Sequence, residues 1–156
     1  MKHLTWPDEA ATEIFAQALA RKAEVRDAFI ELEGELGAGK TPLVRHLLRA
    51  LGVQGRIKSP TYAVVEPYKL SPLNLPCHTL NIWHFDFYRF TDPREWEEAG
   101  FRDLFTAPGL KLAEWAANAR AALPVADLVI RIETLDDGAR SVTLQANTTV
   151  GKALLT

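Results

Sequence analysis

The 156-residue sequence contains one cysteine, Cys77, and no apolar run of membrane-spanning length. A single cysteine excludes an intrachain disulfide and is typical of a reducing compartment, so we expect a cytoplasmic location without membrane association. The N-terminus lacks the hydrophobic core of a signal peptide. The formal net charge of -2 also lacks the basic excess that nucleic-acid-coating proteins need. Any contact with RNA is therefore expected to be indirect.

The amino-acid content is otherwise that of an ordinary folded domain. Hydrophobic residues make up 47% of the chain and charged residues 24%, both close to the averages for soluble globular proteins. A chain of this length is expected to form one domain, over residues 1–156.

A glycine-rich segment over residues 34–41 carries the clearest chemical signal. It reads Gly-Glu-Leu-Gly-Ala-Gly-Lys-Thr and matches the phosphate-binding pattern G-x-x-x-x-G-K-[ST]. Glycines let the backbone turn tightly, so that successive N–H groups point at one anion. The N-terminus of a following helix adds further free N–H groups. Lys40 can reach the β- and γ-phosphates of a nucleotide, and the hydroxyl group of Thr41 can bind Mg²⁺.

The residues around this segment predict a strand, a loop and a helix. Residues 29–33 read as a strand, and apolar residues follow the loop at helical spacing until Gly52, where the helix is expected to end. Further strands are expected over residues 62–68, 80–88, 110–114, 127–133 and 140–145. The last two flank Asp136-Asp137-Gly138, a strong hairpin signal. The fold class is therefore α/β, a mostly parallel sheet of the P-loop NTPase type flanked by helices, with antiparallel additions.

Two more helices are expected. Thr5 is predicted to cap the first, with Asp8 as the reciprocal acid. Asp92 and Pro93 are predicted to open the second, which Gly100 ends. The apolar face of the first helix is expected to contain Ala10, Ala11, Ile14, Phe15, Ala18 and Leu19.

Two acidic residues, Asp86 and Glu114, each stand at the end of an apolar strand-like run. A phosphate loop needs a metal ion and usually a carboxylate on a neighbouring strand, which holds the ion or orients the attacking water. The residue types leave open which acid has which role, and either acid could instead be paired with Arg89 or Lys111. His84 shares strand parity with Asp86, so the two could face one site, although a structural histidine is the commoner case.

Two further side chains could serve the same site. Arg140, just beyond the hairpin signal, could reach a phosphate or a base, although a solvated arginine is the commoner case. Trp115 directly follows Glu114 and could shield the site or stack on a partner, although a tryptophan at such a position more often belongs to the core.

Pro42 departs from the ideal phosphate-loop pattern. It follows the loop hydroxyl, where a backbone N–H normally points at the α-phosphate, and proline has no such group. Proline is tolerated in the first turn of a helix, so we expect the fold to survive. It also disfavours helical backbone at Thr41, and we expect weakened nucleotide affinity.

Three later segments appear after the phosphate loop in a recognisable order, namely Lys58-Ser59-Pro60-Thr61-Tyr62, His84-Phe85-Asp86-Phe87-Tyr88-Arg89 and Glu114-Trp115. With the loop, they resemble TsaE (formerly YjeE), the bacterial ATPase family of tRNA threonylcarbamoyladenosine biosynthesis. The resemblance implies a small P-loop domain that binds ATP with Mg²⁺ and hydrolyses it slowly when alone. It also implies docking on the heterodimer of the threonylcarbamoyl transferase and its non-catalytic paralogue, where hydrolysis supports modification of position 37 in tRNA.

The resemblance further implies roles for particular residues. Lys40 and Asp86 are implied to be catalytic, Lys40 by holding phosphates and Asp86 as base or water positioner. Thr41 and Glu114 are implied to bind the metal ion. The implied switch or partner-sensing residues are Thr61, Tyr62 and Trp115. The implied ATP-binding residues are Thr12, Glu35, Leu36, Gly37, Ala38, Gly39, Lys40, Thr41 and Pro42.

The chain departs from the family pattern at Pro42, where threonine is usual, at Glu35, where aspartate is usual, and after Trp115, where proline is frequent. Two other functions stay open. A P-loop small-molecule kinase would use Lys40 in the same way, although no arginine-bearing lid is evident in the sequence. A nucleotide-gated binding module would use ATP to order the loop around Thr61, with incidental hydrolysis.

Overall fold

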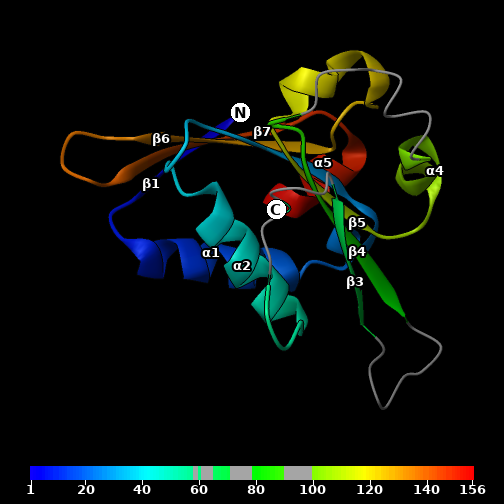
Figure 1. Cartoon of the computed structure of the whole chain (residues 1–156). Coiled ribbons are helices and arrows are strands. Elements are labelled where there is room, and N and C mark those ends of the chain that lie inside the picture. The colour runs from blue at the N-terminus through cyan, green and yellow to red at the C-terminus, as the bar shows by residue number, and fades with distance from the viewer. Residues whose placement is uncertain (58–59, 61–64, 71–78, 90–99) are drawn as a thin grey trace.

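A seven-stranded sheet runs through the protein, in a computed structural model that describes residues 1–57, 60, 65–70, 79–89 and 100–156 (Figure 1). The strand order is β1-β7-β6-β2-β5-β4-β3. The strands are β1 (Lys2–Trp6), β2 (Phe29–Glu33), β3 (Val65–Leu70), β4 (Leu80–Asp86), β5 (Leu110–Glu114), β6 (Leu128–Thr134) and β7 (Arg140–Ala146). The helices are α1 (Glu9–Ala20), α2 (Lys40–Leu51), α4 (Phe101–Thr106) and α5 (Thr149–Leu155), with short 3-10 helices η1 (Ala23–Asp27) and η2 (Ala116–Ala122).

The sheet is parallel only at its centre. Strands β4, β5, β2 and β6 pair in parallel, whereas β1 with β7, β6 with β7, and β3 with β4 pair antiparallel. The predicted α/β class and the antiparallel additions are confirmed, but the prediction of a mostly parallel sheet is confirmed only in part, because three of the six pairings between described strands are antiparallel. The difference comes from the two edges, where hairpins and the unpredicted strand β1 extend the parallel centre.

The first residues form a strand and not the start of a helix. Thr5 pairs with Ser141 in β7, so the predicted helix cap at Thr5 is wrong. Asp8 caps α1 instead, by accepting a hydrogen bond from the backbone N–H of Ala11 at 3.1 Å. The predicted apolar face is wrong in part, since α1 buries Thr12, Ala16 and Leu19 and leaves Ala10, Ile14 and Ala18 exposed.

Two predicted turns are confirmed. The helix after the phosphate-binding pattern ends at Gly52, whose left-handed backbone lets its N–H donate to the carbonyls of Leu48 and Arg49. Strands β6 and β7 form the predicted hairpin, closed by a hydrogen bond from the N–H of Leu135 to the carbonyl of Ala139 at 2.8 Å. Both turns depend on residues close together in the sequence, so the local pattern was sufficient.

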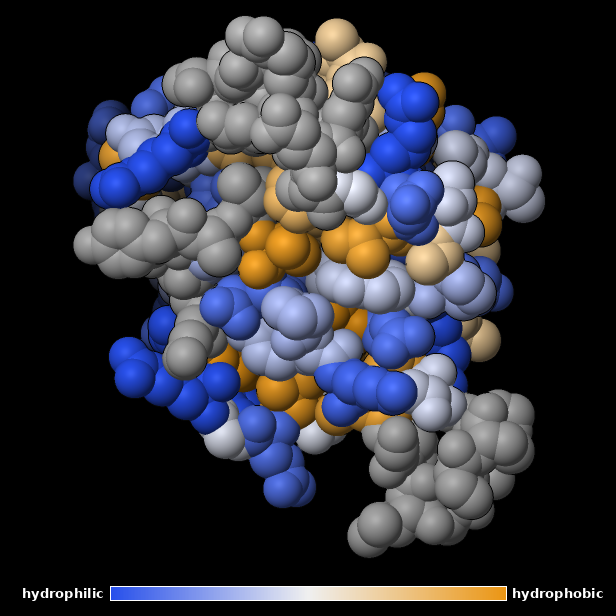
Figure 2. Space-filling model, turned by 45° about the vertical axis from the view of Figure 1, so that its right-hand side comes forward, coloured by the Kyte–Doolittle hydropathy of each residue, from blue (hydrophilic) through white to orange (hydrophobic). Residues whose placement is uncertain are grey.

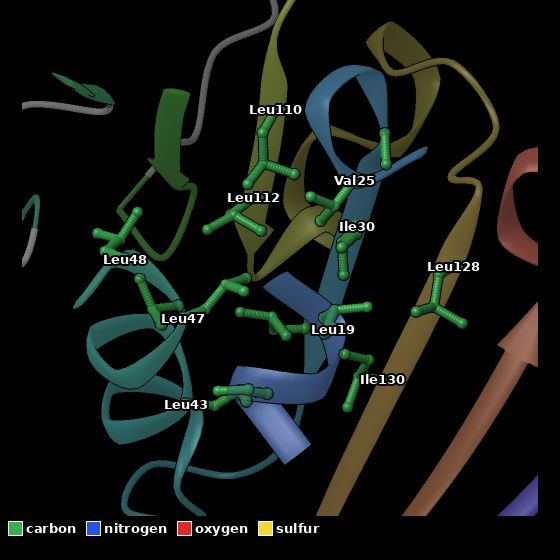
Figure 3. Packing of buried hydrophobic residues seen from close by; sticks show 14 of the residues in the cluster. Leu19, Val25, Ile30, Leu43, Leu47, Leu48, Leu110, Leu112, Leu128 and Ile130 are labelled. Carbon is green, nitrogen blue, oxygen red and sulfur yellow. The ribbon is translucent and has the colours of Figure 1, made fainter. Parts of the chain in front are cut away.

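Helices cover both faces of the sheet and bury two different kinds of side chain. On one face, α1 and α2 lie side by side and pack aliphatic residues against the central strands (Figures 1 and 3). Strand alternation sends Ile30 to this face and Phe29 to the other. The labelled residues of the aliphatic cluster are Leu19, Val25, Ile30, Leu43, Leu47, Leu48, Leu110, Leu112, Leu128 and Ile130. The second cluster includes Phe29, Phe85, Phe87, Phe101 and, from η2, Ala116 and Ala119.

One face of the molecule shows mixed chemistry where its residues are described. Figure 2 shows apolar residues interspersed with polar ones on the face turned forward. In the described part of the chain, no helix combines the length and apolar character needed to cross a membrane.

Some predictions fall outside the described residues. These include the helix expected from Asp92, the cysteine Cys77, and the first residues of the strand expected over 62–68. Within the described residues, that strand is β3 and continues to Leu70.

Helix α5 packs so closely on the start of β6 that its glycine leaves no room for a side chain. A Cβ atom at Gly151 would overlap with the carbonyl oxygen of Asp127. Asp127 is itself fixed, because its carboxylate accepts hydrogen bonds from the N–H of Phe29 and the hydroxyl of Thr148, both at 2.7 Å. We expect Gly151→Ala to lower the free energy of unfolding by about 3 kcal/mol. Denaturant unfolding measures this, with the exposed change Lys152→Ala as control; equal stability of the two variants would contradict the close packing.

Candidate nucleotide-binding site

The predicted strand, glycine-rich loop and helix are all present as β2, residues 34–39 and α2. The loop turns through a hydrogen bond from the N–H of Ala38 to the carbonyl of Glu35 at 3.0 Å. Gly39 adopts a φ of 115° and precedes the first turn of α2. A Cβ atom at Gly34 would lie 2.6 Å from the carbonyl oxygen of Ile132 in β6, so the loop needs glycine where it leaves the sheet.

Helix α2 begins at Lys40, which places Thr41 and Pro42 in its first turn. The prediction that the fold tolerates Pro42 is confirmed, because the N–H groups of a first turn have no partner within the helix. Pro42 disfavours helical backbone at the preceding residue, yet Thr41 lies inside α2. Burial of Leu43 and Val44 against the sheet fixes this turn and outweighs the local preference.

Lys40 is buried at the centre of the loop, with 5% of its surface exposed. Its Nζ donates a hydrogen bond to the carbonyl of Gly34 at 2.6 Å and lies 3.7 Å from the ring centroid of Trp115. Burial lowers the pKa of Lys40, and the negative charges of Glu114, Asp86 and Glu35 oppose that shift. The negative charges of both predicted acids therefore act on the ammonium group.

Asp86 and Glu114 lie directly opposite each other, at the ends of the parallel strands β4 and β5. Glu114 is buried with 3% of its surface exposed. Burial raises the pKa of Asp86, a hydrogen bond from the N–H of Tyr88 at 2.9 Å lowers it, and the charge of Glu114 raises it again. The sequence placed both acids at strand ends, and the sheet register brings those ends together.

Glu114 has a buried partner that the sequence did not identify. Nε2 of His84 lies 2.6 Å from Oε2 of Glu114. The alternative pairing of this acid with Lys111 is wrong, because Nζ of Lys111 donates to the carbonyl of Ala107 instead. Burial lowers the pKa of Lys111, and the negative charge of Asp27 opposes that shift. Asp27 lies near the start of β5, at the opposite end of that strand from Glu114.

Trp115 adopts a left-handed backbone, with φ of 57°, and is the one described residue other than glycine with positive φ. Such a conformation is strained for a bulky residue and is often found at functional sites. It turns the indole ring over Lys40. The ring centroid of Tyr88 lies 5.0 Å from that of Trp115.

The short helix η2 makes hydrogen bonds both to β2 and to the residue that follows β4. Arg120 makes two hydrogen bonds to the buried carboxylate of Glu31 in β2, at 2.6 and 2.9 Å, and this hydrogen bonding raises the pKa of Arg120. Nδ2 of Asn118 donates to the carbonyl of Phe87, just beyond Asp86, at 2.9 Å. These contacts could not be predicted from local sequence patterns, because each joins residues far apart in the chain.

Two cavities flank the loop, one of about 550 Å³ and one of about 140 Å³. The larger is lined by Lys40, Trp115 and the ends of β2 and β6. The smaller is lined by the predicted residues Thr12 and Pro42 and by Arg140. Arg140 also donates through Nη2 to the carbonyl of Gly37 at 3.4 Å. Arg140 therefore lies against the loop, although a solvated side chain was the commoner alternative in the sequence analysis.

The remaining predicted residues are placed as follows. Glu35, Leu36 and Gly37 form the exposed tip of the loop, and Ala38 is buried beneath it. Thr61 and Tyr62, the predicted switch residues, lie outside the described residues.

The oxygen atoms around Lys40 suit Mg²⁺. Thr41 offers a hydroxyl group, and Asp86 and Glu114 offer carboxylates, which are the hard ligands that Mg²⁺ prefers. Mg²⁺ usually takes one or two protein carboxylates and completes its octahedral shell with substrate phosphates and water. Among the residues that the structure describes, no three His, Cys, Asp or Glu side chains form a group that could hold a metal. One hydroxyl and two carboxylates fit an ion that binds together with a nucleotide.

A strand, a glycine loop, a lysine at the start of the next helix and acids on neighbouring parallel strands define the P-loop class of nucleotide-binding proteins. Comparison with known families places the chain more narrowly. The family model described as threonylcarbamoyl adenosine biosynthesis protein TsaE matches residues 6–154. The chain belongs to the TsaE family, which confirms the resemblance found in the sequence and places the protein in tRNA threonylcarbamoyladenosine biosynthesis.

Individual relatives are similar to this chain over most of their length. The tRNA threonylcarbamoyladenosine biosynthesis protein TsaE of Haemophilus influenzae is 40% identical over 141 residues, which cover 90% of this chain and 84% of that protein. The protein of the same name from Bacillus subtilis is 34% identical over 150 residues, covering 94% and 87%. The crystal structure of YdiB from Bacillus subtilis superposes with a TM-score of 0.72 at 27% identity, covering 99% of this chain and 92% of that one.

Proposed function

We propose that this chain is a single-domain P-loop ATPase that binds ATP with Mg²⁺ and hydrolyses it slowly when alone. Its hydrolysis is stimulated on the heterodimer of the threonylcarbamoyl transferase and its non-catalytic paralogue, and it supports repeated modification of position 37 in tRNA. The observation that carries the proposal is the convergence of Lys40, Asp86 and Glu114 at the glycine loop.

Phosphate binding is proposed to start at the N-terminal end of α2, which carries a partial positive charge. The free N–H groups before and within the first turn of α2 point toward an anion. A polyphosphate offers Lys40 a full negative charge, which a charge-assisted hydrogen bond favours over the neutral carbonyl of Gly34. The adenosine part of ATP then lies toward the smaller cavity, where Thr12, Pro42 and Arg140 surround the other side of the loop.

The acids divide the chemistry between them. Thr41 and Glu114 hold Mg²⁺, which supplies positive charge to the phosphate oxygens when bound. Asp86 orients the attacking water and accepts its proton. Burial raises the pKa of Asp86, and this direction makes a carboxylate a better proton acceptor.

Partner contact is proposed at the rim of the site. Leu36 at the loop tip is 70% exposed and Tyr88 is 50% exposed, so both offer apolar or aromatic surface to a partner. Trp115 connects this rim to the phosphate-binding lysine, because its ring contacts both Tyr88 and Lys40. Thr61 and Tyr62 are proposed as the switch segment.

Pro42 weakens nucleotide binding in this proposal, because it removes one N–H from the loop. We expect Pro42→Thr to bind ATP about tenfold more tightly, since a hydrogen bond to a charged group contributes about 1.5 kcal/mol or more. Isothermal titration calorimetry measures the affinity. Pro42→Ala restores the N–H without a hydroxyl group and should gain nearly as much. ATP binding no tighter than that of the parent protein in both variants would contradict this role of Pro42.

The proposal is tested by phosphate release from ATP, with and without the partner heterodimer and tRNA. We expect slow release by the chain alone and faster release with the heterodimer. ADP formation that requires an added small-molecule acceptor would instead indicate a kinase. The structure gives no support to a kinase lid around Arg131, because Arg131 lies in β6 and pairs with Glu33 at 2.8 Å. Modification that proceeds normally in a hydrolysis-deficient variant would indicate a nucleotide-gated binding module.

A further inference from the structure

A buried histidine, His84, lies behind the acidic pair and has no part in the chemistry proposed above. Its Nε2 lies 2.6 Å from Oε2 of Glu114, and the two side chains are only 1% and 4% exposed. Its Nδ1 is buried and has no hydrogen-bond partner among the described residues. Within the described part of the chain, the imidazole therefore makes one polar contact, with Glu114.

This single contact determines which nitrogen carries the proton. A carboxylate accepts hydrogen bonds and cannot donate them, so Nε2 of His84 must be the donor to Oε2 of Glu114. The opposite tautomer would place two lone pairs against each other and would leave an N–H at Nδ1 buried without an acceptor, which is costly. The tautomer with its proton on Nε2 satisfies Glu114 and leaves the lone pair of Nδ1, rather than an N–H group, without a partner among the described residues.

The sheet register puts the contact on the face where the nucleotide site lies. His84 and Asp86 are two residues apart in β4 and share one face, and Asp86 lies opposite Glu114. His84 pairs with Leu112, which belongs to the aliphatic cluster beneath α2. His84 thus reaches Glu114 from the core side, and the nucleotide site lies at the strand end beyond it.

We propose that His84 is a positioning residue for Glu114. It occupies Oε2 and holds the carboxylate in one orientation, so that Oε1 is the oxygen available to Mg²⁺. This inference rests on the proposed function, in which Glu114 binds the metal ion. Groups that hold a metal ligand in place typically contribute tenfold to hundredfold to metal affinity.

The test compares the affinity of a non-hydrolysable ATP analogue in Mg²⁺ with its affinity in EDTA, by calorimetry on the full chain. The ratio of the two affinities isolates the metal contribution. We expect His84→Leu, which keeps the volume but removes the donor, to lower this ratio by about tenfold or more. The affinity in EDTA should stay unchanged, because the loop and Lys40 are intact.

Two polar variants form a matched pair. The amide nitrogen of His84→Gln can reach the position of Nε2, whereas that of His84→Asn can reach only the position of Nδ1. We expect His84→Gln to keep most of the Mg²⁺ dependence and His84→Asn to lose it. Because both variants are polar and similar in size, this comparison also decides the question if His84→Leu fails to fold.

The outcomes separate this proposal from the one on which it rests. An unchanged ratio in His84→Leu, equal ratios in the two amide variants, or a parallel loss of affinity in EDTA would overturn the role of His84 alone. A parent protein that binds the analogue equally well with and without Mg²⁺ would overturn both proposals. In a Glu114→Ala background, His84→Leu is expected to change the ratio no further, and an additional loss would contradict action through Glu114.

Discussion

Replacing Lys40 by alanine is expected to weaken ATP binding by at least 30-fold, or about 2 kcal/mol, while the protein stays folded. Removing one partner of a buried charge pair costs about 2–5 kcal/mol of binding free energy. The fold should survive, because Lys40 is a buried cation that, among the described residues, donates a hydrogen bond to the carbonyl of Gly34 and forms no ion pair. Calorimetry with ATP and Mg²⁺ measures the loss, and the unfolding midpoint reports the fold.

A matched control is available on the same helix. Arg45 is exposed and one turn beyond the loop, so Arg45→Ala changes the charge of α2 by the same amount without touching the candidate site. We expect its ATP affinity to stay within about threefold of the parent value. If Lys40→Ala binds ATP as well as Arg45→Ala does, the loop is not the phosphate site.

Replacing Asp86 by asparagine is expected to separate binding from hydrolysis. The amide keeps the shape of the side chain but cannot accept a proton, and the loss of a general base slows hydrolysis by about 100-fold to 10,000-fold. ATP affinity should stay the same or rise, because the variant removes a negative charge that faces the nucleotide's phosphates. Single-turnover phosphate release in the presence of the partner heterodimer measures the rate, and calorimetry measures the affinity.

Glu114→Gln is the informative comparison for Asp86→Asn. Glu114 is proposed to act through Mg²⁺, so its amide variant should lose the dependence of binding on Mg²⁺, whereas Asp86→Asn should keep it. Hydrolysis by Asp86→Asn at the parent rate would contradict a role for Asp86 in the chemical step. The same defect in both variants would contradict the division of roles.

The sequence predicted those parts of the site that local pattern controls. The glycine spacing and the helical spacing up to Gly52 defined the loop and α2, because both depend on residues that are neighbours in the chain. Asp86 and Glu114 were found because each ends an apolar run, and strand ends of a parallel sheet meet at one edge. Their placement follows from that rule, while their chemical roles stay predictions.

The parts that were missed depend on contacts between distant segments. The contact of His84 with Glu114 joins two strands and leaves no trace in either segment alone. Strand β1 exists because it pairs with β7, at the other end of the chain, which turned the expected helix cap at Thr5 into a strand residue. Pro42 is a further case in which contacts between distant segments override a local preference. Packing of α2 on the sheet keeps Thr41 helical, although the proline that follows disfavours helical backbone there.

The mixed sheet also has a physical reason that the sequence patterns could not reveal. The four central strands, β4, β5, β2 and β6, pair in parallel. The antiparallel pairings at the edges depend on which side of the sheet each additional strand joins. The alternation of apolar residues along a strand does not determine that side. The hairpin of β6 and β7 was predicted because its turn residues are local, whereas the pairing of β3 with β4 was not.

The claim on which the account depends is that main-chain amides of residues 34–41 and the ammonium group of Lys40 hold a Mg²⁺-bound triphosphate. Calorimetric titration of the purified chain with ATP in the presence of Mg²⁺ tests it most directly. We predict saturable binding of one nucleotide per chain, competed by ADP and lost in Lys40→Ala. No detectable binding of either nucleotide to the folded chain, with the partner heterodimer present or absent, would contradict the account.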